Sequence, residues 1–253
     1  MAAIFSLDKH RDQSLTLMAR AVANAPNRPD LVLLQSQLCQ KISHCDPEPI
    51  ELRLRQLDPR NGEGWMGAFV RGEASGDREA TDAAFTEISR SDRVDVYWTG
   101  LIARLTRAVA GTKALSVEDA GVIVIGYLAA EPLPGYTDSS RRCKGEPLDR
   151  AGAVDICRGV AKAFQQGDTY LTEMIGVAVA KRVWPEDSPE WKAAADARRR
   201  YEYQSKLWMK LEAYTLSHAE EYLTLYAQNH REQDVFTAQI IAAGEDPNPP
   251  SAQ

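Results

Sequence analysis

Residues 58–90 read DPRNGEGWMGAFVRGEASGDREATDAAFTEISR, and this stretch decides the fold class. A polar turn containing Pro59 opens it. Apolar residues then recur at helical spacing from 65–69, a Gly-Asp pair at 76–77 interrupts them, and a second apolar face follows over 80–88. Two amphipathic patterns joined by a glycine-containing turn predict an antiparallel helical hairpin.

The turn and the first large apolar position of this hairpin recur on a period of 33 residues. The turn positions are Pro26, Pro59 and Asp92, and the apolar positions six residues later are Val32, Trp65 and Trp98. A period of about 33–34 residues is typical of helix-turn-helix repeats, whose units stack because none buries its apolar face alone. No alternating strand pattern of useful length occurs. We therefore predict an all-α fold of stacked antiparallel hairpins, a short solenoid, followed by a C-terminal helical bundle.

A segment rich in proline and glycine, residues 131–147, divides the chain. It separates a helical-repeat half (1–130) from a C-terminal helical half (148–243), and the proline-containing tail 244–253 is expected to be disordered. Within the first half, the pattern over 116–130 is apolar nearly all round, which predicts a helix at the centre of the fold.

Composition and charge limit the partners of the chain. It has 253 residues, of which 44% are hydrophobic, enough to bury a sizeable core, and its formal charge is −6. An acidic balance argues against wholesale binding of nucleic acid, which needs a basic footprint. The longest apolar run, 122–130, is about half of what a bilayer span needs, so no membrane span is expected. The first residues lack the pattern of a secretory signal, which leaves a cytoplasmic protein or a mature secreted one.

Four cysteines bear on that choice of compartment. Three connectivities are possible, and local pairing of Cys39 with Cys45 and of Cys143 with Cys157 is the economical one. A bend between Cys39 and Cys45 is needed, because a continuous helix would hold these sulfurs about 9 Å apart along its axis. Disulfides favour a periplasmic or secreted protein. Reduced thiols in the cytoplasm, and a metal site of Cys39, His44 and Cys45, are the alternatives.

Two resemblances accompany these patterns. Residues 58–90 are similar to a tetratricopeptide repeat (TPR), with Pro59, Trp65 and Phe85 at the family's turn-proline and aromatic positions, although Phe69 and Gly72 depart from its pattern. The similarity extends over about 26–110 and implies a TPR-like solenoid that binds peptides. The chain as a whole also resembles uncharacterised exported proteins of Gram-negative bacteria, a resemblance that implies no activity and is carried by Cys39, Cys45, Asp58, Pro59, Asn61, Cys143 and Cys157.

Signatures of catalysis and of cofactor binding are missing from the sequence. It contains no phosphate-binding glycine loop and no Gly-x-Ser-x-Gly elbow, and its four histidines lack metal-ligand spacing. We therefore expect no cofactor and predict a non-enzymatic protein that binds another protein or a peptide, or acts as a scaffold. The predicted groove is formed by exposed positions of the first helices, and its residues are Glu63, Met66, Val70, Arg71, Tyr97 and Arg104.

The sequence leaves two other functions to consider. One is an all-α enzyme with its site between the two halves, under the 131–147 loop, where the polar groups would be Tyr136, Asp138, Arg141 and Arg142. A deep pocket with perturbed carboxylates beside that loop would favour the enzyme, and a flat surface would not. The other is nucleic-acid binding by basic and aromatic residues interleaved over 198–210, for which a helix with buried aromatic residues and solvated cations is the better interpretation.

Overall fold

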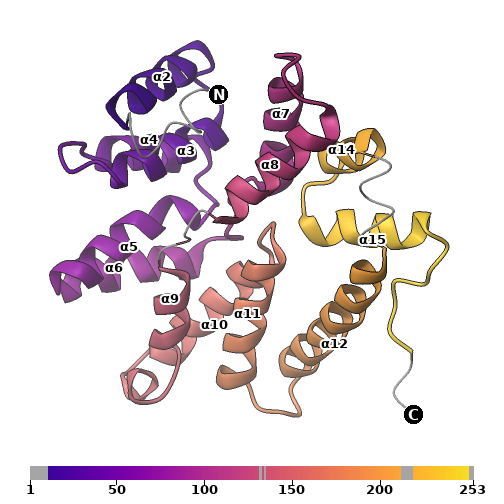
Figure 1. Ribbon diagram of the computed structural model, residues 1–253. Coiled ribbons are helices and arrows are strands. Elements are labelled where there is room, and N and C mark those ends of the chain that lie inside the picture. Colours follow the sequence, from indigo (N-terminus) through magenta and orange to yellow (C-terminus); the bar gives the residue numbers. More distant parts are fainter. Residues whose placement is uncertain (1–10, 131–132, 134, 212–218, 251–253) are drawn as a thin grey trace.

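The computed structural model describes residues 11–130, 133, 135–211 and 219–250, and over these residues the chain is all-α, as predicted (Figure 1). The first seven helices are α2 (Arg11–Asn24), α3 (Pro29–Gln40), α4 (Glu48–Leu57), α5 (Glu63–Ser75), α6 (Arg78–Arg90), α7 (Trp98–Ala110) and α8 (Val117–Ala130). After them come α9 (Tyr136–Arg142), the 3₁₀ turn η1 (Glu146–Asp149), α10 (Ala153–Gln165), α11 (Tyr170–Val183), α12 (Pro189–Lys210), α14 (Ala219–Gln228) and α15 (Glu232–Ala242).

The hairpin predicted over 58–90 is confirmed as α5 and α6. Gly76 ends α5 in the left-handed conformation (φ +71°), which glycine adopts without steric cost. Asp77 then caps α6 by accepting a hydrogen bond from the backbone N–H of Ala80 (3.0 Å). The helices α3, α5 and α7 begin at residues 29, 63 and 98, so their starts are 34 and 35 residues apart, close to the period read from the sequence.

The third hairpin does not continue the stack. Helix α6 packs against α10, whereas the α7–α8 hairpin packs against α14. Figure 1 shows α10 and α11 next to the α5–α6 pair, and α8 near α14 on the other side of the molecule. Gly159 permits the close approach of α10 to α6, because a Cβ at this position would lie 2.3 Å from the carbonyl oxygen of Ser89.

Two hydrophobic clusters form the interior. One joins α3–α6 to α9–α12, and the other joins α2 and α3 to α7, α8, α14 and α15. Helix α3 serves both, because it turns Val32 and Leu33 to the first cluster and Leu34 and Leu38 to the second. Tyr97 and Trp98, at the start of α7, also pack on both clusters. The two clusters therefore meet along α3 and the segment that precedes α7.

Two expectations about the middle of the chain are wrong. Helix α8 is not central: only one face of it is buried, and the side chains of Val122 and Ile123 are 56% and 42% exposed. The segment 131–147 is not a plain loop, because it contains α9 and the first residues of η1. Tyr136, at the start of α9, is buried in the first cluster. This packing stabilises a short helix that the local sequence pattern does not predict.

Both local cysteine pairs are confirmed as disulfides. Cys39 and Cys45 are joined across a turn that follows α3, with their Cα atoms 5.3 Å apart, which is the bend that the pairing needs. The bond between Cys143 and Cys157 (Cα atoms 5.6 Å apart) fixes the end of α9 to α10. No cysteine is free, so the thiol and metal alternatives are set aside. Two disulfides are characteristic of an oxidising compartment.

The described residues of the tail, 244–250, contain no helix. In the tail, the Pro247 carbonyl accepts a hydrogen bond from Gln204 of α12 (3.1 Å), and residues 251–253 lie outside the described residues. Of the helices in the described ranges, none is both long and apolar enough to cross a bilayer.

Candidate functional site

The polar turn that begins the α5–α6 hairpin binds the segment that precedes α7. The side chain of Asn61 donates to the Asp95 carbonyl (2.9 Å) and to the Tyr97 hydroxyl (3.1 Å). Its amide oxygen accepts the backbone N–H groups of Asp95 (2.9 Å) and Glu63 (3.1 Å). One side chain therefore satisfies four polar groups between two chain segments, and it fixes where α7 starts.

Charged groups surround this junction. Arg93 donates to both oxygens of Asp58 (2.9 and 2.8 Å) and to Oδ2 of Asp95 (2.5 Å). The Tyr97 hydroxyl donates to Asp58 (2.8 Å), and Nε2 of His230 lies 2.8 Å from the same Asp95 oxygen. Asp95 is fully buried, so two cations from different parts of the chain offset the cost of burying its charge.

Asp168 connects this junction to the C-terminal half. Its two carboxylate oxygens accept the backbone N–H groups of Val96 (2.9 Å) and Trp98 (2.7 Å), and its own carbonyl accepts the N–H of Glu232 (2.8 Å). The carboxylate of Glu232 in turn accepts the N–H of Tyr170 (2.8 Å). Asp168 therefore holds the start of α7 through its carboxylate and the start of α15 through its carbonyl, and Glu232 joins α15 to the start of α11.

Three carboxyl groups in this region hold their protons more tightly than usual. Burial raises the pKa of Glu63 to about 8, and the hydrogen bond that Tyr136 donates to it (2.9 Å) opposes this only in part. Burial and the nearby charge of Asp95 raise the pKa of Asp168 to about 7 against two backbone N–H bonds. Burial also raises the pKa of Glu232 to about 7. The region is therefore rich in acids that are costly to ionise.

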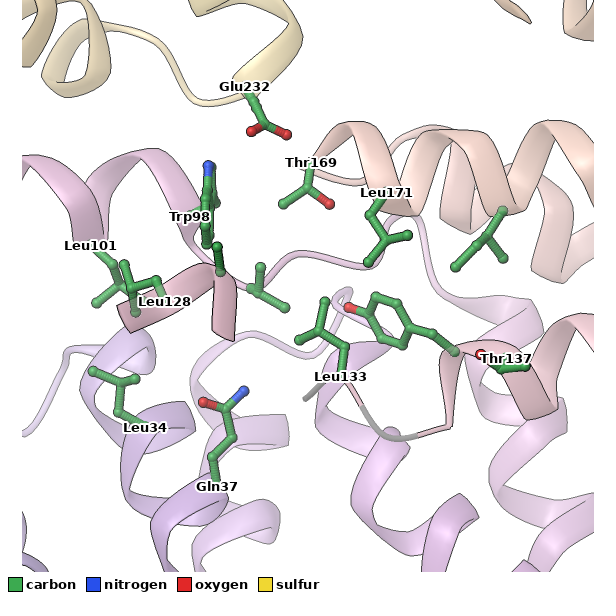
Figure 2. A pocket seen from close by; sticks show the side chains of 14 residues that line it. Leu34, Gln37, Trp98, Leu101, Leu128, Leu133, Thr137, Thr169, Leu171 and Glu232 are labelled. Carbon is green, nitrogen blue, oxygen red and sulfur yellow. The ribbon is translucent and has the colours of Figure 1, made fainter. Parts of the chain in front are cut away.

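A half-open cavity of about 350 Å³ lies where the two hydrophobic clusters meet. Its apolar walls come from α3, α7, α8, α11 and the residues before α9, and its polar groups are few. The apolar lining residues are Leu34, Val96, Trp98, Leu101, Leu128, Ala129, Leu133, Leu171 and Ile175, and the others are Gln37, Tyr136, Thr137, Thr169 and Glu232. Figure 2 shows Glu232 at one end beside Trp98 and Thr169, with Gln37 and Leu34 at the other.

Glu232 is the one acidic group that lines this cavity among the described residues. One of its oxygens, Oε2, accepts the N–H of Tyr170. The indole N–H of Trp98 lies beside the carboxyl and favours its charged form, although it makes no hydrogen bond of ordinary geometry. Among the described residues, the N–H of Tyr170 is the one donor with an ordinary hydrogen-bond geometry to this carboxyl group. The cavity therefore presents an apolar body with a single carboxyl oxygen available at one end.

Two members of the predicted groove are not exposed. Glu63 and Met66 are 8% and 2% exposed, so the expectation that they face solvent is wrong. The chain entering α9 covers this face of α5: a Cβ at Gly135 would lie 2.9 Å from Val70 and 3.4 Å from Met66, and Tyr136 bonds to Glu63. Val70 is accordingly half-buried under the same segment.

The other predicted groove residues are held by carboxylates. Arg71 donates to both oxygens of Glu51 (2.6 and 2.7 Å). Arg104 donates to Asp30 (2.8 Å), and Tyr97 is part of the junction described above. These three side chains come from α5, α7 and the residue before α7, and no contact brings them together into one surface. Whether they contact a partner stays a prediction.

The residues expected under the 131–147 segment divide between two places. Tyr136 lines the cavity, whereas Asp138 and Arg141 pair with each other and Arg142 pairs with Glu73 (2.7 Å) of α5 and with an acid on α6. A cavity lies beside this segment, but of the four polar residues named for the enzyme alternative only Tyr136 is in its described lining. On α12, the basic residues also pair with carboxylates, and these ion pairs are Arg198–Glu202, Arg199–Asp196 and Arg200–Glu173.

The sequence does not single out Asp168 and Glu232, which build the junction. Asp168 follows a glycine between two helical patterns, and Glu232 begins a short one. Nothing in their neighbourhoods distinguishes them from ordinary polar turn residues. Asn61 belongs to the polar turn with Asp58 and Pro59, which is the one sequence signal at the junction.

Comparisons with known proteins give no further guide. No protein-family model, curated protein or solved structure matches the chain. Among the described residues, no group of three or more His, Cys, Asp or Glu side chains is placed to hold a metal ion. The cavity and the polar junction behind it are therefore the features on which a function is argued.

Proposed function

We propose that the protein is a non-enzymatic binding protein for a polypeptide partner, and that apolar side chains of the partner enter the cavity between the two clusters. The observation that carries the proposal is the cavity itself: about 350 Å³, half-open, and walled mainly by apolar side chains, five of which are leucines. Pockets of this size with few polar groups are usual binding sites. Leu171, which lines the cavity, is 51% exposed, so a partner would bury apolar surface that the free chain leaves in water.

The cavity replaces the first-helix groove as the proposed contact surface. Glu63 and Met66 are covered by the chain entering α9, and Arg71 and Arg104 already have carboxylate partners. A partner contacting these arginines would have to compete with existing ion pairs. At the cavity, by contrast, the walls are mainly apolar and the described lining residues form no ion pair, so a partner's apolar side chain would have no ion pair to displace there.

A selection experiment with matched variants tests this proposal. Random twelve-residue peptides displayed on phage are selected on the purified chain, and their affinities are compared with those for Leu171→Asp and Leu52→Asp. Leu52 is 50% exposed and lies on α4, away from the cavity, so the two variants place the same charge at equally exposed leucines. We expect Leu171→Asp to weaken binding by about tenfold or more, since burying a leucine contributes roughly 1.5–3 kcal/mol, and Leu52→Asp to have no effect. Equal affinity for both variants would remove the cavity from the proposal.

We also propose a compartment for the protein and a TPR-like character for part of its fold. We place the protein in the periplasm or outside the cell, because both disulfides fit an oxidising compartment. A cytoplasmic location is the alternative, and it requires the same thiols to remain oxidised there. The TPR-like character is proposed for α3–α6 alone, where two consecutive hairpins pack with α4 against α5.

One observation favours the enzyme alternative, and it deserves a test of its own. Glu232 faces a cavity beside α9 with a pKa raised to about 7, a value suited to a general acid or base. Among the described residues of the cavity, however, no nucleophile is hydrogen-bonded to a base, and this is why binding is preferred. If a reaction is found, Glu232→Gln should abolish turnover while substrate binding persists. A fully active variant would exclude Glu232 as the acid or base.

A further inference from the structure

The shape and charge of the cavity select one kind of side chain from the proposed partner. We infer that the cavity binds a lysine of the partner polypeptide, with the aliphatic stem of the lysine against the leucine walls and its ammonium group on Oε1 of Glu232. This inference rests on the polypeptide-binding function proposed above. It names the residue type that the site recognises and makes Glu232 the residue that determines specificity.

The sign of the charge follows from the one acid in the lining of the cavity. Glu232 lies in its wall, and no basic side chain is among the described lining residues. An anionic ligand would meet repulsion from the Glu232 carboxylate. A wholly apolar ligand would bury Oε1 of Glu232 without a partner, and a buried polar atom without a hydrogen bond is costly. A cation with an apolar stem satisfies the carboxyl group and the walls together.

The number of free acceptor atoms distinguishes lysine from arginine. A guanidinium group binds a carboxylate best through two parallel hydrogen bonds, one to each oxygen. In Glu232, Oε2 already accepts the backbone N–H of Tyr170, so a guanidinium that used both oxygens would have to share Oε2 with that N–H. An ammonium group is a compact charge that needs one oxygen at a time, so it fits where the planar guanidinium fork does not.

Side-chain analogues test this inference directly. The ¹⁵N-labelled chain is titrated at constant ionic strength with n-butylammonium, which reproduces the lysine side chain, and separately with 1-butanol, butyrate and n-butylguanidinium. The readout is the indole N–H signal of Trp98, assigned from Trp98→Phe. We expect n-butylammonium to shift this signal saturably and to bind about tenfold more tightly than each of the other three probes, which is the magnitude of one charge-assisted hydrogen bond.

Variants of the carboxyl group provide the control. Glu232→Gln keeps an oxygen for the N–H of Tyr170 but removes the charge, so the preference for n-butylammonium over 1-butanol should disappear. Glu190→Gln makes the same charge change at an exposed position on α12 and should keep the preference. A preference that survives in Glu232→Gln, equal binding of 1-butanol, or no saturable shift with any probe would overturn the inference.

The selected peptides separate this inference from the proposed function. Peptides that depend on Leu171 but lack lysine would overturn the lysine while leaving polypeptide binding in place. Conversely, saturable binding of n-butylammonium without any Leu171-dependent peptide would indicate a small amine as the ligand, and the polypeptide function would fall. Lysine-containing peptides that lose affinity for both Leu171→Asp and Glu232→Gln support both.

Discussion

Replacing Glu63 by glutamine should make the protein less sensitive to pH between about 5 and 8. Glu63 is buried at the start of α5, and the Tyr136 hydroxyl donates to its Oε2 at 2.9 Å. Burial raises its folded-state pKa to about 8, against about 4.5 in an unfolded chain. Between these two values the folded protein keeps a proton that the unfolded chain loses, so the free energy of unfolding falls as the pH rises.

The magnitude follows from proton linkage. Each pH unit in this window costs about 1.4 kcal/mol of stability for one such group, so moving from pH 5.5 to 7.5 removes about 2.5 kcal/mol through Glu63 alone. Glutamine has a similar shape, offers an oxygen to Tyr136 and does not titrate. The free energy of unfolding of Glu63→Gln, relative to that of the wild type, should therefore increase by about 2.5 kcal/mol over this range.

Urea unfolding followed by circular dichroism at 222 nm, without reductant, measures this difference at pH 5.5, 6.5 and 7.5. Glu79→Gln, which removes a charge from an exposed position on α6, is the control and should shift stability equally at all three values. A difference between Glu63→Gln and wild type that stays constant across the pH range would refute the buried, protonated state of Glu63.

Three further predictions concern the junction and the disulfides. Asn61→Ala removes four hydrogen bonds, three of them to the segment before α7, and should lower the free energy of unfolding by about 3 kcal/mol in urea titrations; a loss below about 1 kcal/mol would contradict the central role of this side chain. Tyr97→Phe removes the hydroxyl that donates to Asp58 and accepts from Asn61, and a smaller loss of about 1–2 kcal/mol is expected by the same measurement. Thiol titration of the unreduced, denatured protein should find no free cysteine, and replacing Cys143 and Cys157 together by serine should lower stability by about 3 kcal/mol, as the closure of a loop with a sequence separation of 14 implies.

Local features of the fold could be predicted from the sequence because local interactions produce them. The α5–α6 hairpin follows from the apolar spacing around Trp65 and Phe85 and from the Gly-Asp turn between the helices. The cysteine pairs lie close in sequence, so their pairing depended on one short turn and one loop. These predictions did not need to know which distant elements pack together.

Packing between distant elements could not be predicted, because it depends on contacts that no local sequence pattern indicates. The contact of α6 with α10 depends on Gly159 fitting against a carbonyl of α6, and one glycine in a helical pattern does not signal a contact. Helix α8 was predicted to be central from its apolar composition. Its residues Val122 and Ile123 are nevertheless exposed, because the α7–α8 hairpin packs against α14 and does not extend the stack of hairpins. The repeat period predicts how hairpins form, and it says less about which hairpins become neighbours.

The candidate site was harder to predict, because its parts are single polar residues from separate elements. Asp168 and Glu232 are 64 residues apart in sequence and become neighbours only when α15 packs beside the start of α11. Asn61 alone belonged to a recognisable motif, the polar turn before α5. A buried carboxylate that accepts backbone N–H groups has no composition signature, since any aspartate in a turn has the same local sequence.

The direction of the pKa shifts connects the stability of the junction to the proposed ligand. Glu63, Asp168 and Glu232 all have raised pKa values, and Asp95 raises the pKa of His230, so ionisation of each acid and loss of the His230 proton all weaken the free protein as the pH rises. A cation bound at Glu232 would oppose that trend for this one group, because the cation is attracted more strongly once Glu232 has lost its proton. The acid that lines the cavity is therefore the one that would favour a lysine over a neutral side chain. Removing the Glu232 carboxylate from water costs free energy, and a bound lysine ammonium group would offset part of that cost. The proposed site would therefore bind lysine more tightly than a neutral side chain of similar shape.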